Sequence, residues 1–184
     1  MRFNVAQLLK GPTGAERRYR LSEDIRHLDP DLHPVGPLEG TVTLMRTSQG
    51  ILVSGELRTM LRLECDRCLE PCDVEVELEL TEEFRPTIML NDVPIDPTPE
   101  DERDEALTID EHHELDLTEV IRQALWLAVP MEALCRVDCA GLCPQCGGNR
   151  NLGECQCVGL VIDPRWAVLE TFLESESEPD ERSE

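Results

Sequence analysis

The amino-acid sequence predicts an α+β fold: an antiparallel β-meander with one or two packed helices and a C-terminal cysteine-rich appendage. Three observations support this prediction. Apolar residues alternate with glutamates over residues 74–80, which is the period of a half-buried strand. Residues 115–130 carry an apolar stripe at helical spacing. Six of the nine cysteines fall within residues 135–157.

Length and composition divide the chain into a main domain and a smaller cysteine-rich part. The 184 residues suffice for one ordinary domain with an appendage, although only 40% of them are apolar and 3% aromatic. We expect residues 1–130 to form the α+β meander domain, with an acidic, proline-rich linker at residues 85–114. Residues 131–173 should hold the cysteine-rich part and a C-terminal helix, and residues 174–184 an acidic tail.

The meander is predicted from three strands. Residues 41–45 form the first, a turn follows at residues 48–50, and residues 51–63 form a longer strand with a bulge at Gly55. The third strand covers residues 74–80. Its buried face should carry four apolar side chains, those of Val74, Val76, Leu78 and Leu80. Before the first strand the sequence predicts only turns and irregular connections.

Two helices are predicted. The first covers residues 115–130, where Asp116 is a suitable N-cap and Glu119 completes a capping box. Its apolar stripe consists of Leu117, Val120, Ile121, Ala124, Leu125 and Ala128. A second, short helix begins at Asp163 with Pro164 in its first position. The side chains available for its burial are those of Trp166, Leu169 and Phe172.

The C-terminal cysteines have the spacing of a zinc knuckle. Cys143 and Cys146 can place both sulfurs on one ion while backbone amides of the turn donate hydrogen bonds to them. Pro144 stiffens the turn, and Gly147 permits a positive φ. We predict a structural Zn²⁺ held by Cys143, Cys146, Cys155 and Cys157, with Cys139 as the first substitute for either of the last two. An iron–sulfur cluster uses the same donor atoms and stays open as an alternative.

A second cysteine cluster lies at a turn between two predicted strands. It is formed by Cys65, Cys68 and Cys72. Arg67, inside the first pair, favours the thiolate form. Two interpretations stay open: a pair of free thiols at the end of a hairpin, which we prefer, and a second zinc site shared with Cys135 and Cys139.

The charge of the chain limits its partners, and its motifs favour a protein that binds partners over an enzyme. Seventeen basic residues against thirty-nine acidic ones give a net charge of −22, which repels nucleic-acid phosphates at long range. The sequence has no phosphate-binding glycine loop and no nucleophile elbow, and its four histidines lack a catalytic partner. Because it has neither a run of 18 apolar residues nor a signal-like N-terminus, we expect a cytoplasmic protein without a membrane span.

The chain resembles the YceD-type family, bacterial and plastid proteins linked to the accumulation of large-subunit ribosomal RNA. Five segments carry the resemblance: the Leu-Glu-Cys-Asp-Arg-Cys-Leu turn at residues 63–69, the acidic linker, the helix ending at Pro130, the cysteine run at residues 139–149, and residues 163–169. The resemblance implies a ribosome-biogenesis factor that supports the accumulation or processing of this RNA. Its partner would be the large-subunit RNA precursor or a basic ribosomal protein.

The candidate contact residues for such a partner are arginines. Arg67 projects from a tight turn, where its guanidinium can pair bidentately with a phosphate or a carboxylate. Arg58 and Arg62 precede it on the same predicted strand. A second basic group lies near the N-terminus and comprises Arg17, Arg18, Arg20 and Arg26. The alternative function is a thiol redox protein that uses Cys65 and Cys68.

Overall fold

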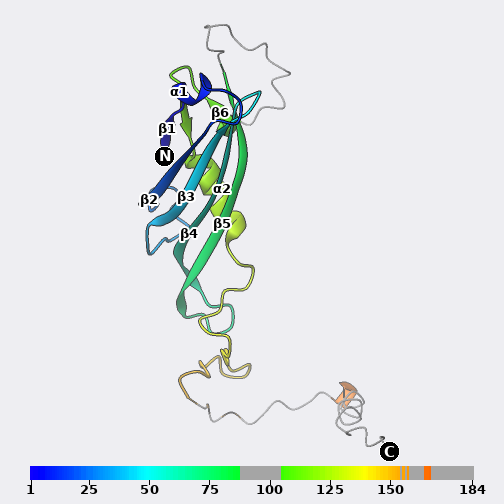
Figure 1. The fold of residues 1–184 in the computed structure, drawn as a ribbon. Coiled ribbons are helices and arrows are strands. Elements are labelled where there is room, and N and C mark those ends of the chain that lie inside the picture. The colour runs from blue at the N-terminus through cyan, green and yellow to red at the C-terminus, as the bar shows by residue number, and fades with distance from the viewer. Residues whose placement is uncertain (88–104, 154, 156, 158–163, 167–184) are drawn as a thin grey trace, which may run out of the picture.

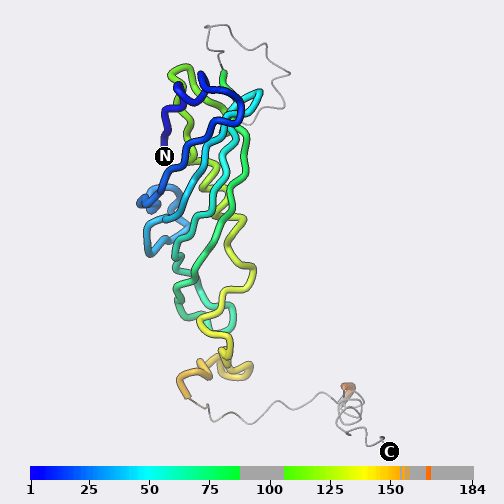
Figure 2. The backbone as a smooth tube through the Cα atoms, in the orientation of Figure 1, coloured from blue at the N-terminus to red at the C-terminus, as the bar shows by residue number. Residues whose placement is uncertain are grey.

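The computed structural model describes residues 1–87, 105–153, 155, 157 and 164–166 (Figure 1, Figure 2). It shows an α+β fold built on one seven-stranded mixed sheet, in the order β1-β7-β6-β5-β4-β3-β2. The strands are β1 (Arg2–Asn4), β2 (Glu16–Glu23), β3 (Leu38–Arg46), β4 (Ile51–Glu64), β5 (Pro71–Pro86), β6 (Thr108–Ile109) and β7 (Glu114–Asp116). The helical elements are α1 (Ala6–Leu9), η2 (Glu105–Leu107), α2 (Thr118–Ala128) and η3 (Pro164–Trp166).

Strands β2 to β5 form the long part of the sheet, each antiparallel to the next. The strands predicted at residues 41–45, 51–63 and 74–80 lie within β3, β4 and β5, which extend beyond them. In Figure 1 these strands run side by side as a long, strongly twisted ribbon, and the β4–β5 turn lies at one end of it.

The predicted bulge at Gly55 is wrong. The β4–β5 ladder continues through this residue without interruption, and Gly55 pairs with Leu80. A Cβ atom at Gly55 would lie 2.7 Å from the carbonyl oxygen of Thr41 in β3. The glycine therefore permits a close approach of two strands, which is another common reason for glycine inside a strand.

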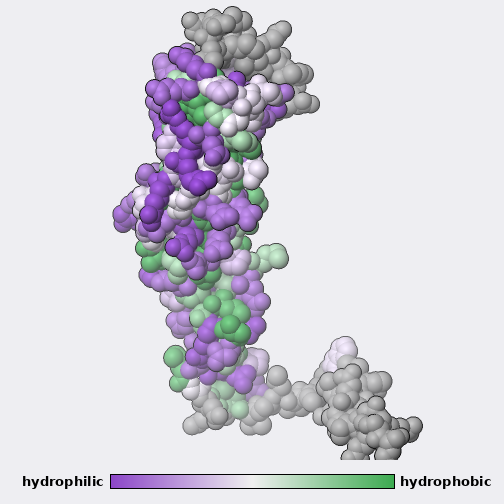
Figure 3. Space-filling view, viewed as in Figure 1, coloured by the Kyte–Doolittle hydropathy of each residue, from purple (hydrophilic) through white to green (hydrophobic). Residues whose placement is uncertain are grey.

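One face of the sheet carries the hydrophobic core, and α2 packs near it against β5 (Figure 1). Of the four side chains expected on the buried face of β5, those of Val76, Leu78 and Leu80 are buried and that of Val74 is half-buried. Phe84 completes this row and has no exposed surface. Figure 3 shows hydrophilic side chains over most of the strand region in this view.

Helix α2 begins later than predicted, at Thr118, and ends at Ala128. The carboxylate of Asp116 still serves its first turn, because it accepts a hydrogen bond from the backbone N–H of Thr118 at 2.9 Å. The predicted capping box is wrong, since Glu119 instead accepts hydrogen bonds from the guanidinium of Arg122. The stripe side chains that α2 buries are Val120, Ile121 and Leu125.

The N-terminal region contains regular structure that the sequence pattern does not predict. β1 pairs with β7, and β2 pairs with β3 along its whole length. β2 is an edge strand in which only Leu21 is buried, so no alternation of apolar and polar residues marks it. Residues 105–114, predicted as part of the acidic linker, likewise contain η2, β6 and the first residue of β7.

Several predictions fall outside the described residues. They concern the middle of the acidic linker at residues 88–104, the second helix apart from the short turn η3, and the tail at residues 174–184. Within the described part of the chain, no helix has the length and apolar character needed to cross a membrane.

Candidate metal centres

The turn between β4 and β5 has the backbone of a metal-binding knuckle. The N–H of Leu69 donates to the carbonyl oxygen of Cys65 at 2.8 Å, and the N–H of Cys65 donates to the carbonyl oxygen of Glu70 at 2.9 Å. Leu69 adopts a positive φ of 60°, a conformation that disfavours residues with a Cβ atom and suits glycine. The fold therefore imposes a knuckle on a sequence that lacks the usual glycine.

The knuckle predicted at Cys143 repeats this backbone pattern. The N–H of Gly147 donates to the carbonyl oxygen of Cys143 at 2.8 Å, and the N–H of Cys143 donates to the carbonyl oxygen of Gly148 at 2.8 Å. Gly147 has a φ of 72°, the positive value expected of it. Two turns far apart in the sequence thus present a Cys-x-x-Cys pair in the same hydrogen-bonding frame.

Four cysteines from two distant segments form the first group. Their sulfurs lie within 4.8 Å of one another, and they belong to Cys65, Cys68, Cys135 and Cys139. The Cys65–Cys139 sulfurs are 3.9 Å apart and the Cys68–Cys135 sulfurs 3.7 Å apart. Tetrahedral thiolates with metal–sulfur bonds of about 2.3 Å stand about 3.8 Å apart. This spacing could hold one metal ion, and it favours a shared site over the free thiols that we preferred from the sequence.

The second group contains the four cysteines predicted as zinc ligands. The sulfurs of Cys143, Cys146, Cys155 and Cys157 also lie within 4.8 Å of one another and could hold an ion. Cys139, considered as a substitute ligand here, lies in the first group instead. Cys72 is buried and, among the described residues, belongs to neither group.

Each group contains one thiol whose pKa is strongly lowered. A hydrogen bond from the backbone amide of Cys135 lowers the pKa of Cys65 to about 6. In the same way, the backbone amide of Cys146 lowers the pKa of Cys143 to about 6. Both residues are therefore thiolates at neutral pH, the form that binds metal ions. By contrast, a hydrogen bond with Cys146 raises the pKa of Cys157 to about 12.

Asn151 lies in the loop of the second group and contacts a cysteine of the first group. It stands in the loop between Cys146 and Cys155, and its side-chain N–H donates to the sulfur of Cys139 at 3.3 Å, which lowers the pKa of that thiol. Its side-chain oxygen accepts a hydrogen bond from the backbone N–H of Ala140 at 2.9 Å. Such bonds orient metal ligands. The sequence alone does not single out Asn151, because an asparagine in a glycine-rich loop indicates only a turn.

The chain after α2 lies along the β4–β5 turn. The backbone N–H of Asp66 donates to the carbonyl oxygen of Ala133 at 2.9 Å, and the Asp66 carboxylate accepts a hydrogen bond from the N–H of Ala133. The N–H of Leu142 donates to the carbonyl oxygen of Arg67 at 2.9 Å. Backbone contacts as well as cysteines therefore join the cysteine-rich part to the sheet.

The three predicted contact arginines all lie close to carboxylates. Arg62 binds Asp73 bidentately, with N–O distances of 2.8 and 3.0 Å. Arg67 is 44% exposed and pairs with Glu132 at 3.2 Å. Arg58 is exposed and lies opposite a glutamate in each neighbouring strand of the ladder. These arginines therefore form a row on β4 and the turn after it. Each of them lies beside an acidic residue of the same chain.

The polar face of the sheet is acidic on one side and basic at the other. β5 exposes a row of carboxylates, those of Asp73, Glu75, Glu77 and Glu79. At the opposite edge, β2 exposes Arg18 and Arg20. The two other N-terminal arginines have local partners, since Arg17 donates to the side chain of Gln7 and Arg26 pairs with Asp24.

The chain matches one protein family, described as large ribosomal RNA subunit accumulation protein YceD, over residues 53–173. Among curated relatives, an uncharacterized protein of Mycobacterium tuberculosis is 38% identical over 71% of this chain and 59% of its own length. The chloroplastic large ribosomal RNA subunit accumulation protein YCED homolog 1 of Arabidopsis thaliana is 26% identical, over 75% of this chain and 48% of that protein. The Zea mays protein of the same name is 24% identical, over 67% and 50%. The chain thus spans less than two thirds of each of these relatives, and no solved structure matches it.

Proposed function

We propose that this chain, which belongs to the YceD family of large ribosomal RNA subunit accumulation proteins, supports the accumulation of that RNA by binding a basic ribosomal protein. The observation that carries the proposal is the acidic row on β5, four exposed carboxylates in one strand. Ribosomal proteins are mostly strongly basic, and a chain of net charge −22 attracts them while it repels RNA phosphates.

We assign one structural zinc ion to each cysteine group. The fit rests on four thiols whose sulfurs lie within 4.8 Å of one another in each group, on spacing near the tetrahedral value in the first group, and on one thiolate in each at neutral pH. A cluster of several irons with bridging sulfides would need its ligand sulfurs farther apart, so this spacing favours a single ion over an iron–sulfur cluster. The ions would fasten the chain after α2 to the β4–β5 turn and take no part in partner chemistry.

Contact with ribosomal RNA through the arginines is the second candidate. Arg58 and Arg62 stand on the same exposed face of β4, and Arg67 follows in the turn. Exposed ion pairs are weak and screened by salt, so a phosphate could displace Glu132 from Arg67. The acidic row on β5 beside these arginines opposes this mode by like-charge repulsion of the RNA backbone.

Burial disfavours the redox alternative. Cys65 has the lowered pKa of a reactive thiol, but its side chain has no exposed surface and that of Cys68 is 4% exposed. A thiol that exchanges with other proteins must be partly accessible. A metal site also accounts for the lowered pKa of Cys65, because the thiolate is the form that binds a metal ion.

The test is a deletion strain complemented with tagged wild-type or variant chain. Deletion should lower mature large-subunit RNA relative to small-subunit RNA, and the wild-type chain should restore it. After ribonuclease treatment, the tagged chain should retain a basic large-subunit protein. If ribonuclease releases the partner, and Arg67→Ala lowers the RNA while Arg67→Lys partly restores it, the contact is to RNA. Unchanged RNA in the deletion strain under all growth conditions overturns the proposal.

A further inference from the structure

One edge of β5 lacks a strand partner over most of its length. β4 pairs with β5 from Pro71 to Phe84, whereas β6 pairs with its other edge only at Arg85 and Pro86. Among the described residues, therefore, residues 71–84 have no strand on that side. A free edge presents backbone N–H and C=O groups that can pair with another chain.

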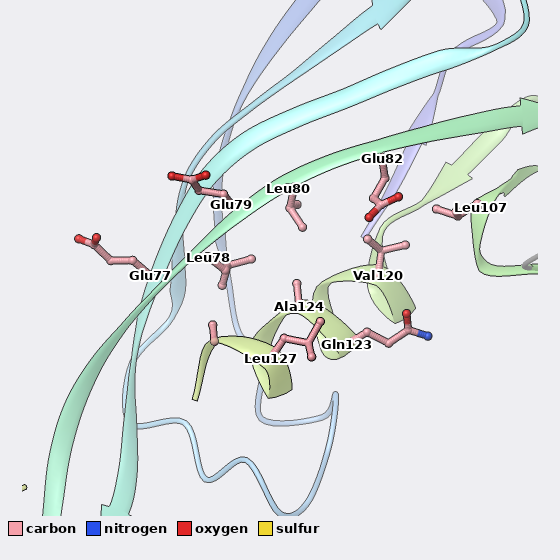
Figure 4. Close-up of a pocket in the computed structure, with 11 residues that line it drawn as sticks. Glu77, Leu78, Glu79, Leu80, Glu82, Leu107, Val120, Gln123, Ala124 and Leu127 are labelled. Atoms are coloured by element: carbon pink, nitrogen blue, oxygen red, sulfur yellow. The ribbon is translucent and has the colours of Figure 1, made fainter. Parts of the chain in front are cut away.

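A groove of about 330 Å³ runs beside this edge, between β5 and α2. Consecutive residues of β5 line it, so the groove follows the strand edge and not one face of the sheet. Figure 4 shows Leu78 and Leu80 pointing toward α2, while Glu77 and Glu79 point away from it on the other side of the strand. Leu127 of α2 forms part of the opposite wall and is 88% exposed.

We infer that this groove binds an extended basic segment of a partner protein as an added β-strand on β5. The inference rests on the proposed function for the class of the partner. Backbone hydrogen bonds to a free edge provide affinity in this mode, and pockets for alternate side chains provide specificity. From Glu77 to Glu82 the edge measures about 17 Å at about 3.4 Å per residue, enough for a segment of about five or six residues.

The two sides of the groove predict the sequence pattern of the segment. Successive side chains of a strand point to opposite faces, so alternate residues of the added strand would face α2 and the others would lie beside Glu77 and Glu79. The α2 side is apolar, with Val120 and Leu127, and favours valine or leucine. The other side favours lysine or arginine, because Glu77 and Glu79 form no ion pair within the described residues, although Arg58 of β4 lies opposite Glu77. The segment should therefore alternate apolar and basic residues.

Charge also decides between the possible occupants. Residues 88–104 of this chain contain six acidic residues and one arginine, so the glutamates of the groove repel them. A second copy carries the same net charge of −22 and is repelled overall. RNA is disfavoured as well, because its phosphates would lie against the acidic strand β5. A basic segment is the occupant that the groove attracts.

The test uses the full chain and a fluorescent heptapeptide of alternating lysine and valine with blocked ends. Fluorescence anisotropy compares it with two derivatives, one N-methylated at the valines and one at the lysines. Strand addition uses the N–H groups of only one edge, which belong to one of these two sets. We expect one derivative to bind at least tenfold more weakly and the other to stay within threefold of the parent. Equal binding of both derivatives overturns strand addition.

Matched variants locate the site. Glu77→Lys with Glu79→Lys should weaken binding at least tenfold, whereas Glu16→Lys with Glu23→Lys, the same charge change on exposed residues of β2, should change it less than twofold. Leu127→Ser should weaken binding several-fold, and the control Leu152→Ser, at another exposed leucine, should not. Equal loss in both charge variants means non-specific attraction and overturns the inference.

Three further outcomes would assign the groove to another occupant and overturn the inference. These are displacement of the peptide by single-stranded uridine RNA, a dimer in sedimentation that the peptide dissociates, and tenfold tighter binding after residues 88–104 are replaced by a glycine–serine linker. The same groove variants in the complemented strain separate this inference from the proposed function. If peptide binding is lost but ribosomal RNA stays normal, the groove is a peptide site and its role in RNA accumulation fails.

Discussion

The sheet body and the cysteine end of this molecule are held together by different kinds of contact. The body, residues 1–87 and 105–130, buries one apolar core that joins its long strands and α2. The cysteine end, residues 131–157, leaves Val137 and Leu152 in solvent, 91% and 83% exposed. A segment with so little apolar burial needs another source of order, which thiolate–metal bonds supply in small modules.

The first cysteine group contains residues from both regions. Cys65 and Cys68 belong to the β4–β5 turn of the body, whereas Cys135 and Cys139 belong to the cysteine end. An ion in this group would join the two regions, while an ion in the second group would close a loop within the cysteine end. The two ions should therefore have different structural consequences.

Metal removal has the largest expected effect and would show whether the two regions are independent. Chelation should make the eight grouped thiols reactive and open residues 131–157 to protease, because structural zinc contributes on the order of 10 kcal/mol to the folding of small modules. The strands and α2 of the body should stay protected from protease, because their core contains none of the cysteines. Mass spectrometry of alkylated peptides measures the reactivity of the thiols, mass spectrometry of proteolytic fragments measures protection from protease, and elemental analysis measures zinc.

Two double variants separate the ions. Cys143→Ser with Cys146→Ser should halve the zinc content and leave Cys65 protected from alkylation. Cys65→Ser with Cys68→Ser should also halve it, but should release the cysteine end from the body. If chelation opens residues 1–87 and 105–130 to protease as fast as residues 131–157, the two regions share one core and are not independent.

The body could be predicted from the sequence where its buried apolar residues recur at the regular spacing of a strand or a helix. The alternation that ends in Leu78 and Leu80 predicted β5, and the apolar stripe predicted α2. β2 has no such spacing of apolar residues, because it is an edge strand with one buried side chain, Leu21. β6 is two residues long and β7 three, and both are strands because they pair with neighbouring strands. Local propensity is weaker than tertiary pairing in elements this short.

The metal centres could be predicted where the turn residues themselves are diagnostic. Pro144 and Gly147 mark the knuckle at Cys143 in the sequence. At Cys65 the corresponding position is Leu69, whose φ of 60° follows from the fold and not from its residue type. Cys68 and Cys135 lie 67 residues apart, and only the docking of the chain after α2 on the β4–β5 turn brings them together.

A pair of glycine variants tests how closely the cysteine end is docked on the body. Gly141 has a φ of 67°, and a Cβ there would lie 2.9 Å from the carbonyl oxygen of Arg67. Gly141→Ala should therefore combine an unfavourable φ, about 1–3 kcal/mol, with a backbone clash. Gly147→Ala has a similar φ of 72° but open space around it, so it reports the φ effect alone. We expect faster alkylation of Cys139 in Gly141→Ala than in Gly147→Ala, and equal rates would contradict close docking.

The smallest expected effect concerns an ion pair inside the body. Arg122 binds Glu119 at 2.6 Å and Asp29 at 3.3 Å, and so ties α2 to the loop after β2. Hydrogen bonds from Arg122 lower the pKa of Glu119 from 4.5 to about 2. A carboxyl group with a depressed folded-state pKa contributes stability above its unfolded pKa and loses it as the pH falls through the folded value. The contribution should be complete above about pH 4.5 and vanish near pH 2.

Urea unfolding of wild type and Arg122→Met, both with chelator throughout, measures this contribution without the metal centres. The midpoint of the variant should be slightly lower at pH 7, because solvent still screens these partly exposed ion pairs, and the difference should shrink as the pH falls from about 4.5 toward 2. Arg18→Met is the matched control, since Arg18 is exposed on β2 and has no ion pair within the described residues. A difference for Arg122→Met that appears only in the metal-loaded chain would mean that the ions stabilise α2, so the body would depend on the cysteine end after all.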